Sequence, residues 1–246
     1  MREWHDRFFA GLYGRVLAGS FDAQANRRQA AGIRKFLRLK RGQTVLDMPC
    51  GQGRITLELA KLGLQTVGVD RQAGYIRKAK AEAGKRHIRA VFRVGDMRKS
   101  EPGDNYDAVV NWFSSFGYFT ESQNRQVLVN FLKALKPGGK VLIDVLNRDW
   151  IKDHFVPKAD LTVQGVKVSE KRNWMVDRKR IRSTWVFTRG GRRETYRIDM
   201  KLFNPPELKA MLRKAGFAGI RLYADLKGKP AGRKQLRLIA VAVKSG

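Results

Sequence analysis

The stretch that most constrains the fold is 45–60, VLDMPCGQGRITLELA, where a short apolar strand leads into a glycine turn and an amphipathic helix. Gly51 and Gly53 carry no Cβ, so the backbone can turn tightly there and come close to a ligand. The apolar side of the helix is formed by Ile55, Leu57, Leu59 and Ala60. Because free N–H groups at a helix start suit a carboxylate or phosphate, this unit predicts a nucleotide-cofactor site.

Three residues narrow the choice of cofactor. Thr56 stands where a dinucleotide fingerprint has its third glycine. Asp47 ends the strand directly before the glycine turn. A second apolar strand ends in Asp70, at the distance where a carboxylate can hold a ribose.

The residues from Asp47 to Gly53, followed by Gly68-Val-Asp70, resemble motif I and its successor in class I S-adenosylmethionine (SAM)-dependent methyltransferases. The resemblance continues in order through three further segments: Gly95-Asp96-Met97, 111–119 and 135–142. The second of these is similar to the segment after strand four in small-molecule N-methyltransferases. The alternative is an unrelated doubly wound domain with a chance glycine turn.

This resemblance implies an α/β fold with a doubly wound, seven-stranded Rossmann-like sheet. We expect one domain over 1–246, with an N-terminal helical lid (1–40), a cofactor-binding core (41–151 and 201–246) and an insertion (152–200). Residues 1–18 have the spacing of one amphipathic helix, which either lids the cofactor or covers the sheet edge.

SAM is therefore the implied cofactor and S-adenosylhomocysteine (SAH) the product, and we expect no metal. By the resemblance, Arg28 pairs with the SAM carboxylate, although with Arg27 it could equally be a solvated face. Asp96 would accept a hydrogen bond from the adenine amino group or instead cap a helix. The complete predicted cofactor set is Arg28, Asp47, Pro49, Gly51, Gly53, Asp70, Arg71, Asp96, Met97, Asn111 and Phe113.

The insertion alternates apolar and polar residues, and Gly190-Gly191 predicts a hairpin, so we expect an antiparallel flap beside the cofactor cleft. Its aromatic residues would pack on the sheet or line an acceptor pocket: Trp174, Trp185 and Phe187. Its basic residues would face solvent: Arg178, Lys179, Arg180, Arg192 and Arg193.

The chain has 51 Lys and Arg against 22 Asp and Glu, a net charge of +29. Such a surplus favours an anionic partner, either RNA, a membrane surface or an acidic substrate. The alternative is a basic surface without such a partner, because net charge bears on association and not on the fold.

The cysteine count and the hydropathy pattern bear on the compartment. Cys50 is the one cysteine, so no internal disulfide can form and we expect a cytoplasmic protein. A cytosine-methylating enzyme needs a nucleophilic cysteine near the substrate, and Cys50 lies in the cofactor loop instead. No apolar run approaches the roughly 18 residues of a membrane span. The oligomeric state is left open.

We consider three functions. The first is in-line transfer of a methyl group from SAM to N or O of a small molecule, with Tyr118 and His154 as the candidate catalytic residues. The second is an RNA (tRNA)-directed methyltransferase that uses the basic surface. The third is a non-catalytic binding protein. The intact glycine loop and the two acids downstream of it, Asp70 and Asp96, argue against this third function.

Overall fold

A computed structural model describes residues 3–16, 22–99, 103, 105–175 and 179–246. Its main sheet has seven strands in the order β10-β11-β5-β4-β1-β2-β3, of which only the β5–β11 and β10–β11 pairs are antiparallel. This confirms the predicted Rossmann-like sheet. The strands are β1 (Thr44–Asp47), β2 (Gln65–Asp70), β3 (Val91–Val94), β4 (Tyr106–Asn111), β5 (Leu135–Leu146), β10 (Phe217–Tyr223) and β11 (Arg237–Lys244).

Helices cover both faces of this sheet. Successive residues of a strand point to opposite faces, so neighbouring residues of β1 pack against different helices. Val45 packs with α3 (Ala23–Leu37) and α4 (Arg54–Lys61), whereas Leu46 packs in the cluster that holds α6 (Glu121–Ala134) and α8 (Pro205–Lys214). The fifth helix, α5 (Ala73–Lys85), packs on α4 and β3. Within the described residues, no helix is long and apolar enough to cross a membrane.

The insertion forms a second, antiparallel sheet in the order β6-β7-β8-β9, which we call the flap. It comprises β6 (Lys158–Val163), β7 (Val166–Met175), β8 (Arg180–Arg189) and β9 (Arg192–Lys201), and it follows α7 (Arg148–Asp153). Gly190 and Gly191 have φ of 51° and 77° and close the predicted hairpin. The division of the chain into one domain with the predicted boundaries stays a prediction.

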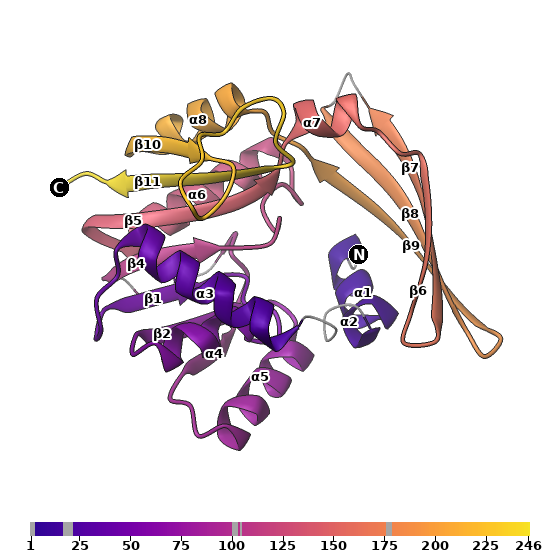
Figure 1. The fold of residues 1–246 in the computed structure, drawn as a ribbon, viewed down its shortest axis with the longest axis horizontal. Helices are drawn as coiled ribbons and strands as arrows, with labels where there is room; N and C mark the ends of the chain where they lie inside the picture. Colours follow the sequence, from indigo (N-terminus) through magenta and orange to yellow (C-terminus); the bar gives the residue numbers. More distant parts are fainter. Residues whose placement is uncertain (1–2, 17–21, 100–102, 104, 176–178) are drawn as a thin grey trace.

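The N-terminal segment lies between the flap and the core (Figure 1). It forms two helices, α1 (Trp4–Ala10) and α2 (Leu12–Val16), so the prediction of one continuous helix was wrong. The break falls at Gly11, where a Cβ would lie 1.8 Å from the Tyr196 hydroxyl of β9. Phe8 packs against the buried Phe187 of the flap, so these helices bind the flap through an apolar cluster of their own.

Candidate active site

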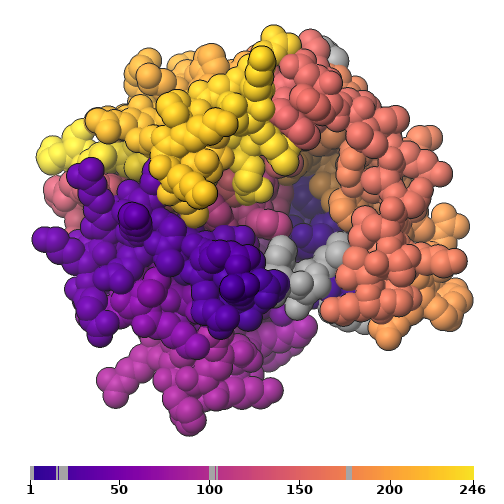
Figure 2. Space-filling model, viewed as in Figure 1, coloured from indigo at the N-terminus to yellow at the C-terminus, as the bar shows by residue number. Residues whose placement is uncertain are grey.

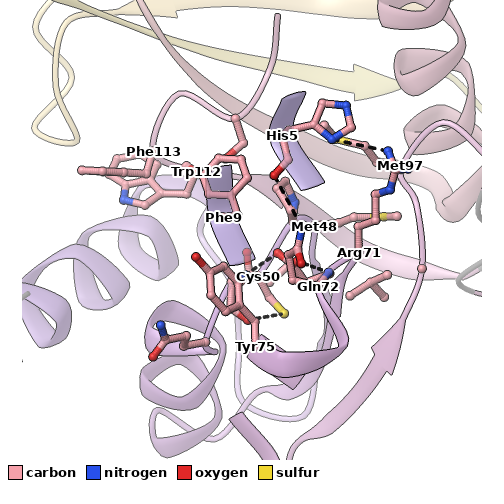
Figure 3. Close-up of a pocket in the computed structure, with 18 of the residues that line it drawn as sticks. His5, Phe9, Met48, Cys50, Arg71, Gln72, Tyr75, Met97, Trp112 and Phe113 are labelled. Atoms are coloured by element: carbon pink, nitrogen blue, oxygen red, sulfur yellow. Dashed lines mark hydrogen bonds between the residues drawn. The ribbon is translucent and has the colours of Figure 1, made fainter. Parts of the chain in front are cut away.

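A cavity opens at the carboxyl ends of β1, β2 and β4, where ligands bind in open α/β sheets (Figure 3). Its walls come from α1, the glycine loop after β1, and the segments after β2, β3 and β4. Eight of the predicted cofactor residues line it: Asp47, Pro49, Gly51, Asp70, Arg71, Asp96, Met97 and Phe113. We call it the first cavity.

The two loop glycines have different tasks. Gly51 lines the cavity with a φ of 57°, and a Cβ there would meet no atom within 4 Å. Gly53 is outside the cavity wall, with a φ of 81°, and its Cβ would lie 2.9 Å from the Phe92 ring. Gly51 therefore gives a ligand access to the backbone, and Gly53 lets α4 start close to its neighbours.

Two buried carboxylates stand at the strand ends. Asp70 accepts hydrogen bonds from the backbone N–H groups of Gly51 and Gln72, both at 2.8 Å, and burial raises its pKa to about 6. Asp47 accepts a 2.6 Å hydrogen bond from the Thr56 hydroxyl, and burial raises its pKa to about 7. Donors on a bound ligand would favour the ionised forms of both groups.

At the β2–β3 side of the cavity, acids and arginines form a network that we call the N-terminal clasp: Glu3, Asp6, Arg71, Asp96 and Arg98. Arg98 lies 2.7 Å from both Glu3 and Asp96. The Arg98 hydrogen bond lowers the pKa of Glu3 to about 2. The clasp ties α1 over the cavity and occupies the guanidinium of Arg71, for which we had expected a role in cofactor binding.

Two further predicted cofactor residues do not line the cavity in this structure. Arg28 is exposed and lies 3.9 Å from Asp22, away from the cavity walls. A guanidinium that does line the cavity is that of Arg54, which donates to the side-chain oxygens of Asn26 (3.0 Å) and Gln29 (2.7 Å). Arg54 directly follows Gly53, and that place beside the turn was the available sequence signal.

The second of these residues is Asn111, which is fully buried. Its side-chain amide donates to the Met48 carbonyl at 2.9 Å and approaches the Met97 sulfur at 3.7 Å. As the last residue of β4, it supports the loop beneath the cavity, and its buried side-chain oxygen has no hydrogen-bond partner among the described residues.

Phe113 is presented to the cavity by an unusual backbone. Phe113 and Ser114 have φ of 69° and 58°, a left-handed region that is uncommon for residues other than glycine. The Phe113 N–H donates to the buried Asp144 carboxylate at 2.8 Å. The ring is 40% exposed and has the guanidinium carbons of Arg54 and Arg237 at 5.0 and 5.6 Å.

A second cavity of about 500 Å³ lies between the N-terminal helices, α7 and the flap. Figure 2 shows the hollow between flap and core, with indigo N-terminal atoms at its base. Four aromatic residues line both cavities: Phe9, Tyr13, Phe113 and Tyr118. We call these four the junction.

The two predicted catalytic residues lie at different places. Tyr118 belongs to the junction, and burial raises its pKa, so the phenol keeps its proton. His154 is exposed and lines only the second cavity, where it stacks on Trp150 at 4.3 Å. Both residues therefore line the second cavity, and Tyr118 alone of the two also lines the first.

The aromatic and basic residues of the flap do not all lie where we had expected them. Trp185 lines the second cavity and Phe187 packs on α1, whereas Trp174 lines neither cavity. Arg180 does not face solvent, since it pairs with Asp199 and donates to the Phe119 carbonyl. Lys179 pairs with Glu207, Arg192 and Arg193 are exposed, and Arg178 lies outside the described residues.

Comparison with known proteins decides the family. The profile of a family described as "Methyltransferase domain" matches residues 45–139. The glycine/sarcosine N-methyltransferase of Halorhodospira halochloris is 30% identical over 196 residues, covering 76% of this chain and 70% of that protein. The chain belongs to the SAM-dependent methyltransferases.

Other relatives of this methyltransferase agree. A ubiquinone biosynthesis O-methyltransferase of Bradyrhizobium sp. is 32% identical over 121 residues, 47% of this chain and 45% of that protein. The chain spans about half the length of most such relatives. The CcbJ methyltransferase from Streptomyces caelestis has the same fold, with a TM-score of 0.80, 17% identity and coverage of 99% and 98% of the two chains.

Proposed function

We propose that this chain is an enzyme that binds SAM in the first cavity and methylates N or O of a small molecule held in the second. The observation that carries the proposal is the junction, where four aromatic residues belong to the walls of both cavities. A cofactor and an acceptor in adjoining cavities can meet only there. In-line displacement needs such a meeting point, at near-contact distance and without water.

The residues of the first cavity fit SAM. Tyr75 lines this cavity, and its buried hydroxyl has no hydrogen-bond partner among the described residues. Because buried polar groups are normally paired, a polar group of the cofactor is a fitting partner for it. Gly51 leaves open space where a side chain would stand. We assign Asp70 to the ribose hydroxyls and Arg54, in place of Arg28, to the carboxylate. Asp96 and Met97 remain our assignment for the adenine.

When bound, SAM supplies a methyl group on a positively charged sulfur, and its transfer to a lone pair on the acceptor leaves the neutral thioether SAH. The junction residues align the two molecules and exclude water. Their π-faces also suit the positive charge on the sulfur of SAM. Because Tyr118 retains its proton, we propose that it orients the acceptor by a hydrogen bond and does not act as a base.

The RNA alternative lacks a comparable observation. The second cavity is lined mainly by apolar side chains, whereas binding of an RNA backbone depends on Lys and Arg. We therefore retain RNA only as a possible partner of the basic surface. The cytoplasmic location also stays a prediction.

Calorimetry with SAM and SAH tests the proposed function. We expect both to bind at micromolar concentrations or below and to compete for one site. Binding of NAD without binding of SAM would overturn the proposal. A parallel tRNA titration at several salt concentrations tests the alternative, which requires tight binding that weakens steeply with salt.

A further inference from the structure

The second cavity is unusually rich in aromatic side chains. Of the 23 described residues that line it, nine are Trp, Phe or Tyr, although the whole 246-residue chain has only 13 Phe, 5 Trp and 6 Tyr. They come from the N-terminal helices, the loop after β4, α7 with the residues directly after it, and the flap, so four separate parts of the chain supply rings to one space. Trp185 from β8 lies 5.7 Å from Phe8 and 6.3 Å from Tyr13, measured between ring centroids.

The charged groups in this wall are already paired. Glu170, buried on β7, pairs with Arg172, and Arg237 pairs with the fully buried Asp144. Removing one member of a buried pair leaves the other uncompensated, which is strongly unfavourable. An ammonium or a carboxylate on the acceptor would therefore have to compete with an existing partner.

Part of the exposed wall of this cavity is apolar as well. Among the described residues, six large hydrophobic side chains are exposed, and three of them line this cavity: Phe113, Val156 and Leu236. Exposed apolar side chains that gather at one cavity indicate that a ligand covers them.

We propose that the second cavity binds an uncharged, flat aromatic acceptor. This inference rests on the proposed function only where it calls the ligand a methyl acceptor. The preference for an uncharged aromatic ligand rests on the residues that line the cavity. Aromatic rings favour stacked or edge-to-face contact with another ring, and a neutral ring leaves both ion pairs intact. These contacts do not distinguish a phenolic oxygen from an aromatic amine nitrogen as the attacking atom.

A matched series of naphthalenes tests the preference by calorimetry at pH 7.5. The probes are 2-naphthol and 2-naphthylamine, both neutral, 2-naphthoate, an anion, and 2-naphthylmethylammonium, a cation. They share one ring system and differ chiefly in charge. Each is titrated into the full chain with and without saturating SAH.

We expect both neutral probes to bind at least tenfold more tightly than either charged probe. Trp185→Leu should weaken the neutral probes about five- to tenfold and leave SAH affinity unchanged. Trp174→Leu, on the same sheet but outside both cavities, is the matched control and should bind the probes like the wild type.

Three outcomes would overturn the inference: a charged probe that binds as tightly as the neutral ones, no binding of the neutral probes, or equal effects of the two tryptophan variants. The ranking of the probes on the wild-type chain decides the matter even if Trp185→Leu fails to fold. Loss of SAH binding with the probe ranking intact would instead refute the proposed function alone.

Discussion

Arg54 gives the most discriminating test of the cofactor assignment. We expect Arg54→Gln to weaken SAH binding, because the SAM and SAH carboxylate would lose its guanidinium partner. Hydrogen bonds to charged groups contribute about 1.5–3 kcal/mol, which corresponds to roughly 10- to 150-fold in affinity. Arg28→Gln is the matched control and should change SAH affinity little, since Arg28 is exposed beside Asp22.

Arg54 also bridges α3 and α4 through Asn26 and Gln29, so a purely structural effect has to be separated. The ligand 5′-methylthioadenosine serves this purpose because it lacks the amino-acid carboxylate. Calorimetry with the Arg54→Gln variant should show unchanged affinity for it and weaker binding of SAH. Equal weakening of both ligands would refute the assignment and make Arg54 a structural residue.

Three further predictions concern the strand ends and the loop. Asp70→Ala should cost about 1.5–3 kcal/mol of SAH affinity by calorimetry, and unchanged affinity would exclude the ribose role. The pKa of Asp47 is raised from 3.8 to about 7, so between these values the native state holds a proton that the unfolded chain has released. The contribution of Asp47 to the free energy of unfolding therefore falls as pH rises through this range, by at most about 1.4 kcal/mol per pH unit. Urea unfolding of the Asp47→Asn variant at several pH values should lack this decrease. Gly53→Ala should destabilise the fold by about 1–3 kcal/mol in urea, because its Cβ would meet the Phe92 ring; an unchanged midpoint would contradict this.

The parts of the site that depend on local backbone geometry could be predicted from the sequence. Gly51 and Asp70 follow from the strand, turn and helix pattern around them, and the structure places both in the cavity wall. The seven-stranded sheet was implied by the family resemblance that these motifs carry, and the structure has it. These features need no knowledge of distant contacts.

The parts that depend on contacts between distant segments could not be predicted. The choice of Arg54 over Arg28 depends on how α3 packs on α4. Asp96 is held by Arg98, which also binds Glu3, 95 positions away in the chain. At Gly11, where α1 ends, a Cβ would lie 1.8 Å from the Tyr196 hydroxyl of the flap, a residue 185 positions away in the chain. No local pattern carries such information.

A crystal structure with SAH bound is the most direct test of where the cofactor and the acceptor meet. We expect the adenosine in the first cavity, the ribose hydroxyls on Asp70, the carboxylate on Arg54, and the sulfur at the junction, facing the second cavity. A sulfur that points away from Phe9, Tyr13, Phe113 and Tyr118, or a carboxylate on Arg28, would contradict this expectation.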